Sequence, residues 1–138
     1  MKIIGFNLTK ILAEKKENFT GKIEVNQNID IKDIVKDSLP ITEEVVLKID
    51  FALQINYSPE MAKLEFAGNL LTVPEKEELK DILKSWKDKK IPDETRIPLF
   101  NFIMSKCNIK ALSLEDEMNF PLHIQMPRLG MPPKEDKQ

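Results

Sequence analysis

The stretch VVLKIDFALQINY, residues 45–57, carries the clearest structural pattern in the chain. Every second position is apolar or aromatic, namely Val45, Leu47, Ile49, Phe51, Leu53, Ile55 and Tyr57. Successive side chains of a strand point to opposite faces of its sheet, so this alternation predicts a strand with one buried face. The positions in between are mostly polar, which is typical of an antiparallel sheet covered on one side only.

Shorter alternating segments precede this strand. Residues 4–13 predict a first strand, with a bulge near residues 9–10 that accounts for a one-residue slip of the apolar positions. Residues 23–31 predict a second strand. The polar segment 15–21 between them ends in glycine and predicts a hairpin connection. Residues 33–42 contain serine and proline and predict a longer loop.

The second half of the chain changes from strands to helices. A short fourth strand is expected from Ala62 and ends at Gly68 and Asn69. Thr72 and Glu75 then have capping-box spacing, and they predict an amphipathic helix that ends near residue 89.

A second helix is expected over residues 98–112. Apolar side chains surround most of it: Leu99, Phe100, Phe102, Ile103, Met104, Cys107 and Ile109. A helix that is apolar nearly all round must be buried on more than one side, which favours a subunit interface. The predicted fold class is α+β, with a four-stranded antiparallel sheet followed by two C-terminal helices. Residues 1–130 are expected to form a single domain, and residues 131–138 a polar tail.

An extended closing segment, MNFPLHIQMPRL at residues 118–129, follows the second helix. Its prolines exclude a central strand, because each removes a backbone donor. We expect Phe120, Leu122, Ile124 and Met126 to face inward, leaving His123 and Gln125 facing outward. Two interpretations remain open: the segment forms a wall of an apolar groove, or it merely covers the second helix.

Composition limits the functions open to the chain. The net charge is −2, which argues against nonspecific binding of nucleic acid. No apolar run approaches the roughly 18 residues of a membrane span, so membrane insertion is not expected. A single cysteine, Cys107, permits no intrachain disulfide and fits a reducing, cytoplasmic location.

Candidate catalytic and metal-binding residues are sparse. His123 is the only histidine and is expected at the surface, while Cys107 is expected to be a buried, inert thiol. One His and one Cys are too few for a zinc centre. Carboxylates occur in charged runs such as residues 115–117, which are typical of solvated faces. We therefore expect no enzyme, catalytic residue, metal site or cofactor. An unrecognised enzyme would need a pocket holding His123, Cys107 or a desolvated carboxylate.

The order of these elements resembles the bacterial export chaperone family SecB. Residues 44–49, EVVLKI, resemble the third strand of that family, and Phe66-Ala67-Gly68 followed by Leu70-Leu71 resembles the exit of its fourth strand. Residues 119–124, NFPLHI, resemble the segment after its helix. The resemblance extends over residues 3–129, and it includes a small uncharacterised archaeal family of similar fold. The charged first helix departs from the glycine-containing exit of SecB.

This resemblance implies an oligomer, a homodimer or homotetramer, that binds unfolded or partly folded polypeptides along apolar grooves without ATP. The candidate groove residues are Trp86, Phe100, Phe120, Leu122, Ile124 and Met126. The alternative is an oligomeric structural or regulatory protein with one specific protein partner.

Overall fold

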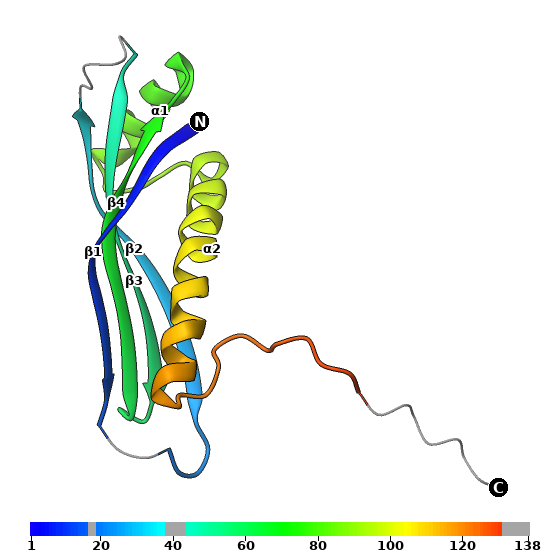
Figure 1. Ribbon diagram of the computed structural model, residues 1–138. Coiled ribbons are helices and arrows are strands. Elements are labelled where there is room, and N and C mark those ends of the chain that lie inside the picture. Colours follow the sequence, from blue (N-terminus) through cyan, green and yellow to red (C-terminus); the bar gives the residue numbers. More distant parts are fainter. Residues whose placement is uncertain (17–18, 38–43, 131–138) are drawn as a thin grey trace, which may run out of the picture.

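The computed structural model describes residues 1–16, 19–37 and 44–130. Its elements are β1 (Lys2–Lys15), β2 (Glu24–Asp37), β3 (Val46–Ser58), β4 (Ala62–Val73), α1 (Lys76–Trp86) and α2 (Asp93–Met118). The strands form one antiparallel sheet in the order β1-β4-β3-β2. The long helix α2 lies along this sheet (Figure 1). The α+β class expected from the sequence is confirmed.

The core is built on β3 and β4, the two central strands. The alternating residues of β3 are at most 1% exposed: Leu47, Ile49, Phe51, Leu53, Ile55 and Tyr57. They pack with Leu64, Phe66 and Leu70 of β4 and with buried residues of both helices. Burying each large apolar side chain contributes about 1.5–3 kcal/mol, so the pattern that predicted β3 also marks the most stabilising part of the sheet.

The prediction of a hairpin between the first two strands is wrong. β1 pairs with β4 and β2 pairs with β3, so β1 and β2 lie on opposite edges of the sheet. Phe19, in the connection between them, packs its ring 5.6 Å from Tyr57 and 5.6 Å from Phe120, measured between ring centroids. This aromatic anchor holds the connection at the end of the sheet, where it crosses from one edge to the other.

The predicted loop over residues 33–42 is wrong in its first part. β2 continues to Asp37, after a register shift between Ile31 and Asp33 in its pairing with β3. The shift inserts one extra residue, so that Ile34 faces the core and is buried. Strict alternation ends at such a bulge, which made the strand appear to stop. Residues 38–42 of the predicted loop lie outside the described residues.

The sequence predicted that the fourth strand ends at Gly68, and this prediction is wrong. β4 continues to Val73, paired on both sides. Next to Gly68, the register of β1 shifts between Leu8 and Lys10, as expected for the predicted bulge. A Cβ at position 68 would collide with the carbonyl oxygen of Asn7. Glycine is therefore required here by close backbone approach rather than by a turn.

The cap of the first helix lies three residues later than predicted. The N-cap is Glu75, whose backbone N–H donates to Glu78 Oε1 at 3.3 Å. Thr72 remains in β4, because it pairs with Ile3 of β1 and Leu47 of β3 and is fully buried there. The sheet thus holds the residue that local sequence favours as a cap.

Both helices also end elsewhere than predicted. α1 ends at Trp86 rather than near Lys89, and α2 extends over Asp93–Met118 rather than over residues 98–112. Pro98 lies inside α2, within its second turn. The proline lacks the N–H that would bond the carbonyl oxygen of Glu94, so the helix has one hydrogen bond fewer near its start.

The buried face of α2 is a stripe with four-residue spacing: Thr95, Leu99, Ile103, Cys107, Ala111 and Glu115. Each step turns about 40° around the helix, so the stripe winds slowly, as a helix on a twisted sheet requires. Ile97 and Ile109 lie away from it and are 57% and 70% exposed. The subunit interface expected for this helix stays a prediction.

Candidate functional site

A groove of about 480 Å³, lined by apolar and charged side chains in equal number, lies between the edge strand β2 and the region where α1 connects to α2. It is lined by Ile29, Asp30, Ile31, Trp86, Lys89, Lys90, Ile91, Asp93, Arg96 and Phe100. Because β2 is an edge strand, one side of its backbone has no strand partner within the described sheet. The groove thus combines apolar side chains with exposed backbone hydrogen-bonding groups.

The rim of this groove carries more positive than negative charge. The Nζ of Lys89 lies 4.7 Å from the centre of the Trp86 ring, a cation–π contact that holds the indole at the rim. Arg96 forms an ion pair with Asp93 at 2.8 Å. Lys90 adds a third positive charge beside the apolar side chains.

A second apolar surface lies on the closing segment. Leu122, Ile124 and Met126 are 44%, 37% and 48% exposed, and Leu129 is fully exposed. Of the four apolar residues expected to face inward, only Phe120 is buried, and the centre of its ring lies 5.3 Å from that of Tyr57. The prediction that Leu122, Ile124 and Met126 face inward is therefore wrong. We call residues 122–130 the closing arm.

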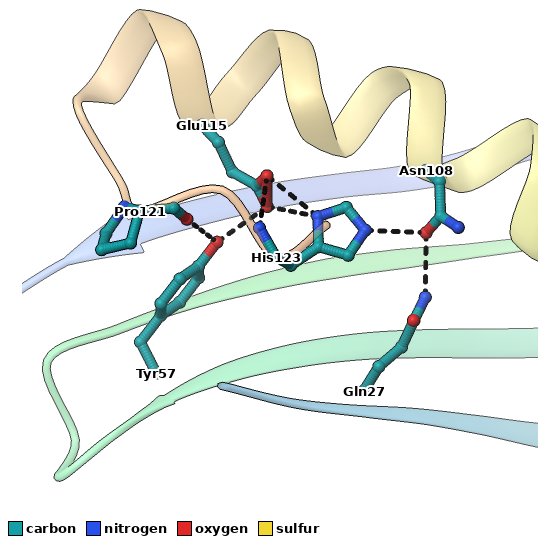
Figure 2. Close-up of polar contacts among 6 residues, drawn as sticks. All are labelled: Gln27, Tyr57, Asn108, Glu115, Pro121 and His123. Atoms are coloured by element: carbon teal, nitrogen blue, oxygen red, sulfur yellow. Dashed lines mark hydrogen bonds and ion pairs between the residues drawn. The ribbon is translucent and has the colours of Figure 1, made fainter. Parts of the chain in front are cut away.

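His123 points inward instead, and its side chain is 2% exposed. The prediction that His123 lies at the surface is therefore also wrong. Figure 2 shows His123 between α2 and β2. Its Nδ1 lies 2.8 Å and 2.9 Å from the two carboxylate oxygens of Glu115, and its backbone N–H donates to Glu115 Oε1 at 3.1 Å. Its Nε2 lies 2.9 Å from Asn108 Oδ1, which also accepts from Gln27 Nε2 at 3.0 Å. Polar pairing thus reverses the side-chain direction that hydrophobicity favours.

The hydrogens in this cluster can be counted. Nδ1 of His123 needs one to donate to Glu115, and Nε2 needs another to donate to Asn108, so these contacts match a positively charged ring. A neutral ring also fits, either if Glu115 donates a carboxyl proton to Nδ1 or if the side-chain amides of Asn108 and Gln27 are both reversed. In the first arrangement Glu115 and His123 form a buried ion pair with every polar atom of the imidazole bonded.

Tyr57 of β3 completes the cluster. Its hydroxyl lies 2.7 Å from Glu115 Oε2 and 2.8 Å from the carbonyl oxygen of Pro121, and its single proton can be donated to either. Burial, followed by the adjacent Glu115 carboxylate, raises the pKa of Tyr57 far above its usual range. The hydroxyl therefore stays protonated and acts as a donor. Glu115 is surrounded by donors, as a buried carboxylate requires.

Glu115 was expected to lie in a solvated run with Asp116 and Glu117, and this expectation is wrong. Glu115 is fully buried, whereas its two neighbours are exposed. A signal was present in the four-residue spacing, because Glu115 continues the stripe of Cys107 and Ala111 on α2. This cluster links α2, β3 and the closing segment, and we assign it a structural role.

Cys107 is buried on α2 as predicted, and burial raises the pKa of its thiol to about 11. The unfolded thiol ionises near its ordinary value of 9.0. Stability from the protonated thiol is therefore present below pH 9 and is lost as pH rises toward 11. At pH 8 we expect iodoacetamide to label Cys107 slowly in the folded protein and rapidly in urea. Mass spectrometry measures the labelling, and fast labelling of the folded chain would contradict the burial of Cys107.

The six residues predicted to line one groove fall into two groups within a chain. Trp86 and Phe100 line the groove beside β2, whereas Phe120 is buried and Leu122, Ile124 and Met126 are exposed on the closing segment. The 26 residues of α2, about 39 Å at 1.5 Å per residue, begin near the first group and end at the second. One chain by itself does not bring the six together.

The described ranges contain no group of three or more His, Cys, Asp or Glu side chains placed to hold a metal ion. Cys107 and His123 belong to different surroundings: the thiol lies in the apolar core and the imidazole in the polar cluster. Within the same ranges, neither helix has the length and apolar character needed to cross a membrane.

The chain can be compared with known proteins in both sequence and architecture. No protein-family model matches the chain, and no curated protein matches it. Among solved structures, the chain is similar to a SecB-like chaperone of Mycobacterium tuberculosis in complex with a ChAD peptide from the HigA1 antitoxin. The identity is 17% and the TM-score 0.49, and the alignment covers 95% of this chain and 91% of that one.

Proposed function

We propose that this protein binds unfolded or partly folded polypeptides without ATP, as a holdase-type chaperone. The observation that carries the proposal is the groove beside β2, where Trp86 and Phe100 lie near a strand edge that has no strand partner among the described residues. An extended client segment can add its backbone to such an edge and place alternate side chains in the groove. The resemblance of the chain to SecB in the order of its elements supports the same function.

The chemistry of the groove supports clients of mixed character. Ile29 and Ile31 of β2 contribute apolar side chains, while the charged lining consists of three basic residues, Lys89, Lys90 and Arg96, and two acidic ones, Asp30 and Asp93. Apolar side chains of a client would be buried against the apolar lining, and acidic side chains would lie near the basic residues. Main-chain pairing is independent of sequence, which suits a protein that receives many clients.

An aggregation assay tests this function. In stoichiometric excess and without nucleotide, the protein should slow the light-scattering increase of a chemically denatured client after dilution. Phe100→Ser should reduce this protection severalfold, because it removes the aromatic wall of the groove. Ile109→Ser is the matched control, since Ile109 lies on the same helix, is exposed and is not a groove residue. Urea unfolding of both variants would confirm that they remain folded.

Two results would count against the proposal. If the unmodified protein gives no protection at stoichiometric excess, the holdase function is wrong. If Phe100→Ser and Ile109→Ser protect equally well, the groove is not the binding site. Selective capture of a single partner, without protection of denatured clients, would instead favour the structural or regulatory alternative.

The closing arm provides a further comparison of exposed and buried positions. Leu122→Ser combined with Ile124→Ser should leave the urea midpoint of the monomer nearly unchanged, because both side chains are already substantially exposed within one chain. Phe120→Ala should lower the free energy of unfolding by about 3–5 kcal/mol, because it empties a buried aromatic cluster. Equal destabilisation by the two changes would contradict the observed direction of the arm.

A further inference from the structure

The closing arm offers apolar side chains that its own chain leaves uncovered. The chain bends at His123 and Ile124, and from there the arm leaves the end of α2 and runs away from the body of the protein (Figure 1). Met126 is 48% exposed and Leu129 fully so. Extended apolar segments of this kind usually mark a contact with another chain.

The backbone of the arm is suited to pair along one edge only. In an extended strand, the N–H and C=O of one residue point to the same side and those of the next residue to the other. Ile124, Met126 and Arg128 share one edge and all keep their N–H groups. Gln125 and Pro127 share the other, where the proline lacks a donor. The intact edge thus includes Ile124 and Met126, two of the exposed apolar residues of the arm.

The matching acceptor is the edge of β2. The opposite edge strand, β1, has register shifts at two points and carries several lysines, and both features hinder strand addition. β2 pairs without a shift from Glu24 to Ile31. That stretch contains Glu24 and Asp30 but no basic residue, whereas Lys89, Lys90 and Arg96 line the adjoining groove, so charge does not select this edge for an arm that carries Arg128. The regular pairing of the stretch therefore favours β2.

The arm of the same chain is directed away from this edge. His123 is held between Glu115 and Asn108, and Gln27 of β2 donates to the same Asn108 oxygen. This bridge joins β2 to α2 where the arm would have to enter between them. A second copy has no such restriction.

We propose that the closing arm of one copy pairs with the β2 edge of a second copy and places Ile124 and Met126 against Trp86 and Phe100. Reciprocal exchange of two arms gives a closed twofold dimer. Four of the six residues predicted for one groove then meet across two chains. If the groove also binds clients, as in the proposed function, a client must displace the arm.

Matched proline substitutions test the contact in the full chain without any client. Light scattering during size-exclusion chromatography should give the mass of a dimer at micromolar concentration. Ile124→Pro removes a donor from the pairing edge and should weaken dimerisation by about tenfold or more. Gln125→Pro removes a donor from the other edge and should leave the dissociation constant within about threefold.

Disulfide trapping distinguishes exchange between chains from docking within one. A tagged Met126→Cys variant mixed with an untagged Ile29→Cys variant should form a mixed disulfide, while buried Cys107 stays unreactive. A monomer at all concentrations, or equal effects of the two prolines, would overturn the arm exchange. So would a chain carrying both cysteines that forms only an intrachain bond. None of these results would affect the aggregation assay, so the holdase function stands or fails separately.

Discussion

Glu115→Ala should lower the free energy of unfolding by about 3 kcal/mol or more, because each buried donor left without its acceptor costs about 1–3 kcal/mol. The change leaves Tyr57 and His123 without their shared acceptor in a site that water does not reach. Typical domains are stable by only about 5–15 kcal/mol, so the variant would be close to unfolding. Urea titration monitored by the fluorescence of Trp86, the only tryptophan, measures the loss.

Glu117, two residues after Glu115 on the same helix, provides the control. Glu117→Ala removes the same kind of side chain from an exposed position, and it should change stability by no more than about 0.5 kcal/mol. Tyr57→Phe keeps the aromatic packing and removes only the hydroxyl. The stability that it loses should therefore lie between the losses of Glu115→Ala and Glu117→Ala. A loss below about 1 kcal/mol for Glu115→Ala would contradict the inference that the cluster anchors the closing segment.

Gly68→Ala should destabilise the sheet by about 3 kcal/mol or more, at the upper end of the range for overpacking. Its Cβ would collide with the carbonyl oxygen of Asn7 and lie 2.9 Å from Cα of Leu8. These are backbone atoms, so no side-chain rotation can relieve the contact. β1 would have to move away from β4, and the urea midpoint should fall accordingly.

Gly5→Ala is the matched control on the neighbouring strand. The nearest atom to a Cβ at position 5 is Cδ1 of Leu71 at 3.5 Å, an ordinary van der Waals contact with a flexible side chain. We expect a change within about 1 kcal/mol. Hydrogen exchange of the β1 amides would show whether the Gly68 variant has lost its edge strand. Equal stabilities of the two variants would contradict the close approach of β1 and β4.

Regular elements were predictable because their periodicity is written in adjacent residues. The alternation in VVLKIDFALQINY predicted β3 and its core face, and the positions of Trp86 and Cys107 on helices followed in the same way. Predictions failed where a bulge interrupted the pattern, as at Ile31 in β2. They failed again where pairing overrode a local cap, as at Thr72.

The candidate site was predictable only in part. Trp86 and Phe100 were chosen for their apolar character, and they do line a groove. The direction of the closing arm was missed, because hydrophobicity favours burying Leu122 and Ile124. The polar pairing of His123 with Glu115, eight residues earlier in the sequence, acts in the opposite sense and prevails.

By itself the sequence determined the α+β class and the central strand β3, because both follow from apolar positions repeated at regular spacing. Tertiary structure alone decided that β1 pairs with β4, that Glu115 is buried and that the arm points outward. These depend on partners distant in the chain, such as Asn7 beside Gly68 and Tyr57 beside Glu115. A one-dimensional pattern does not record such partners, so only the folded chain shows which groups satisfy one another.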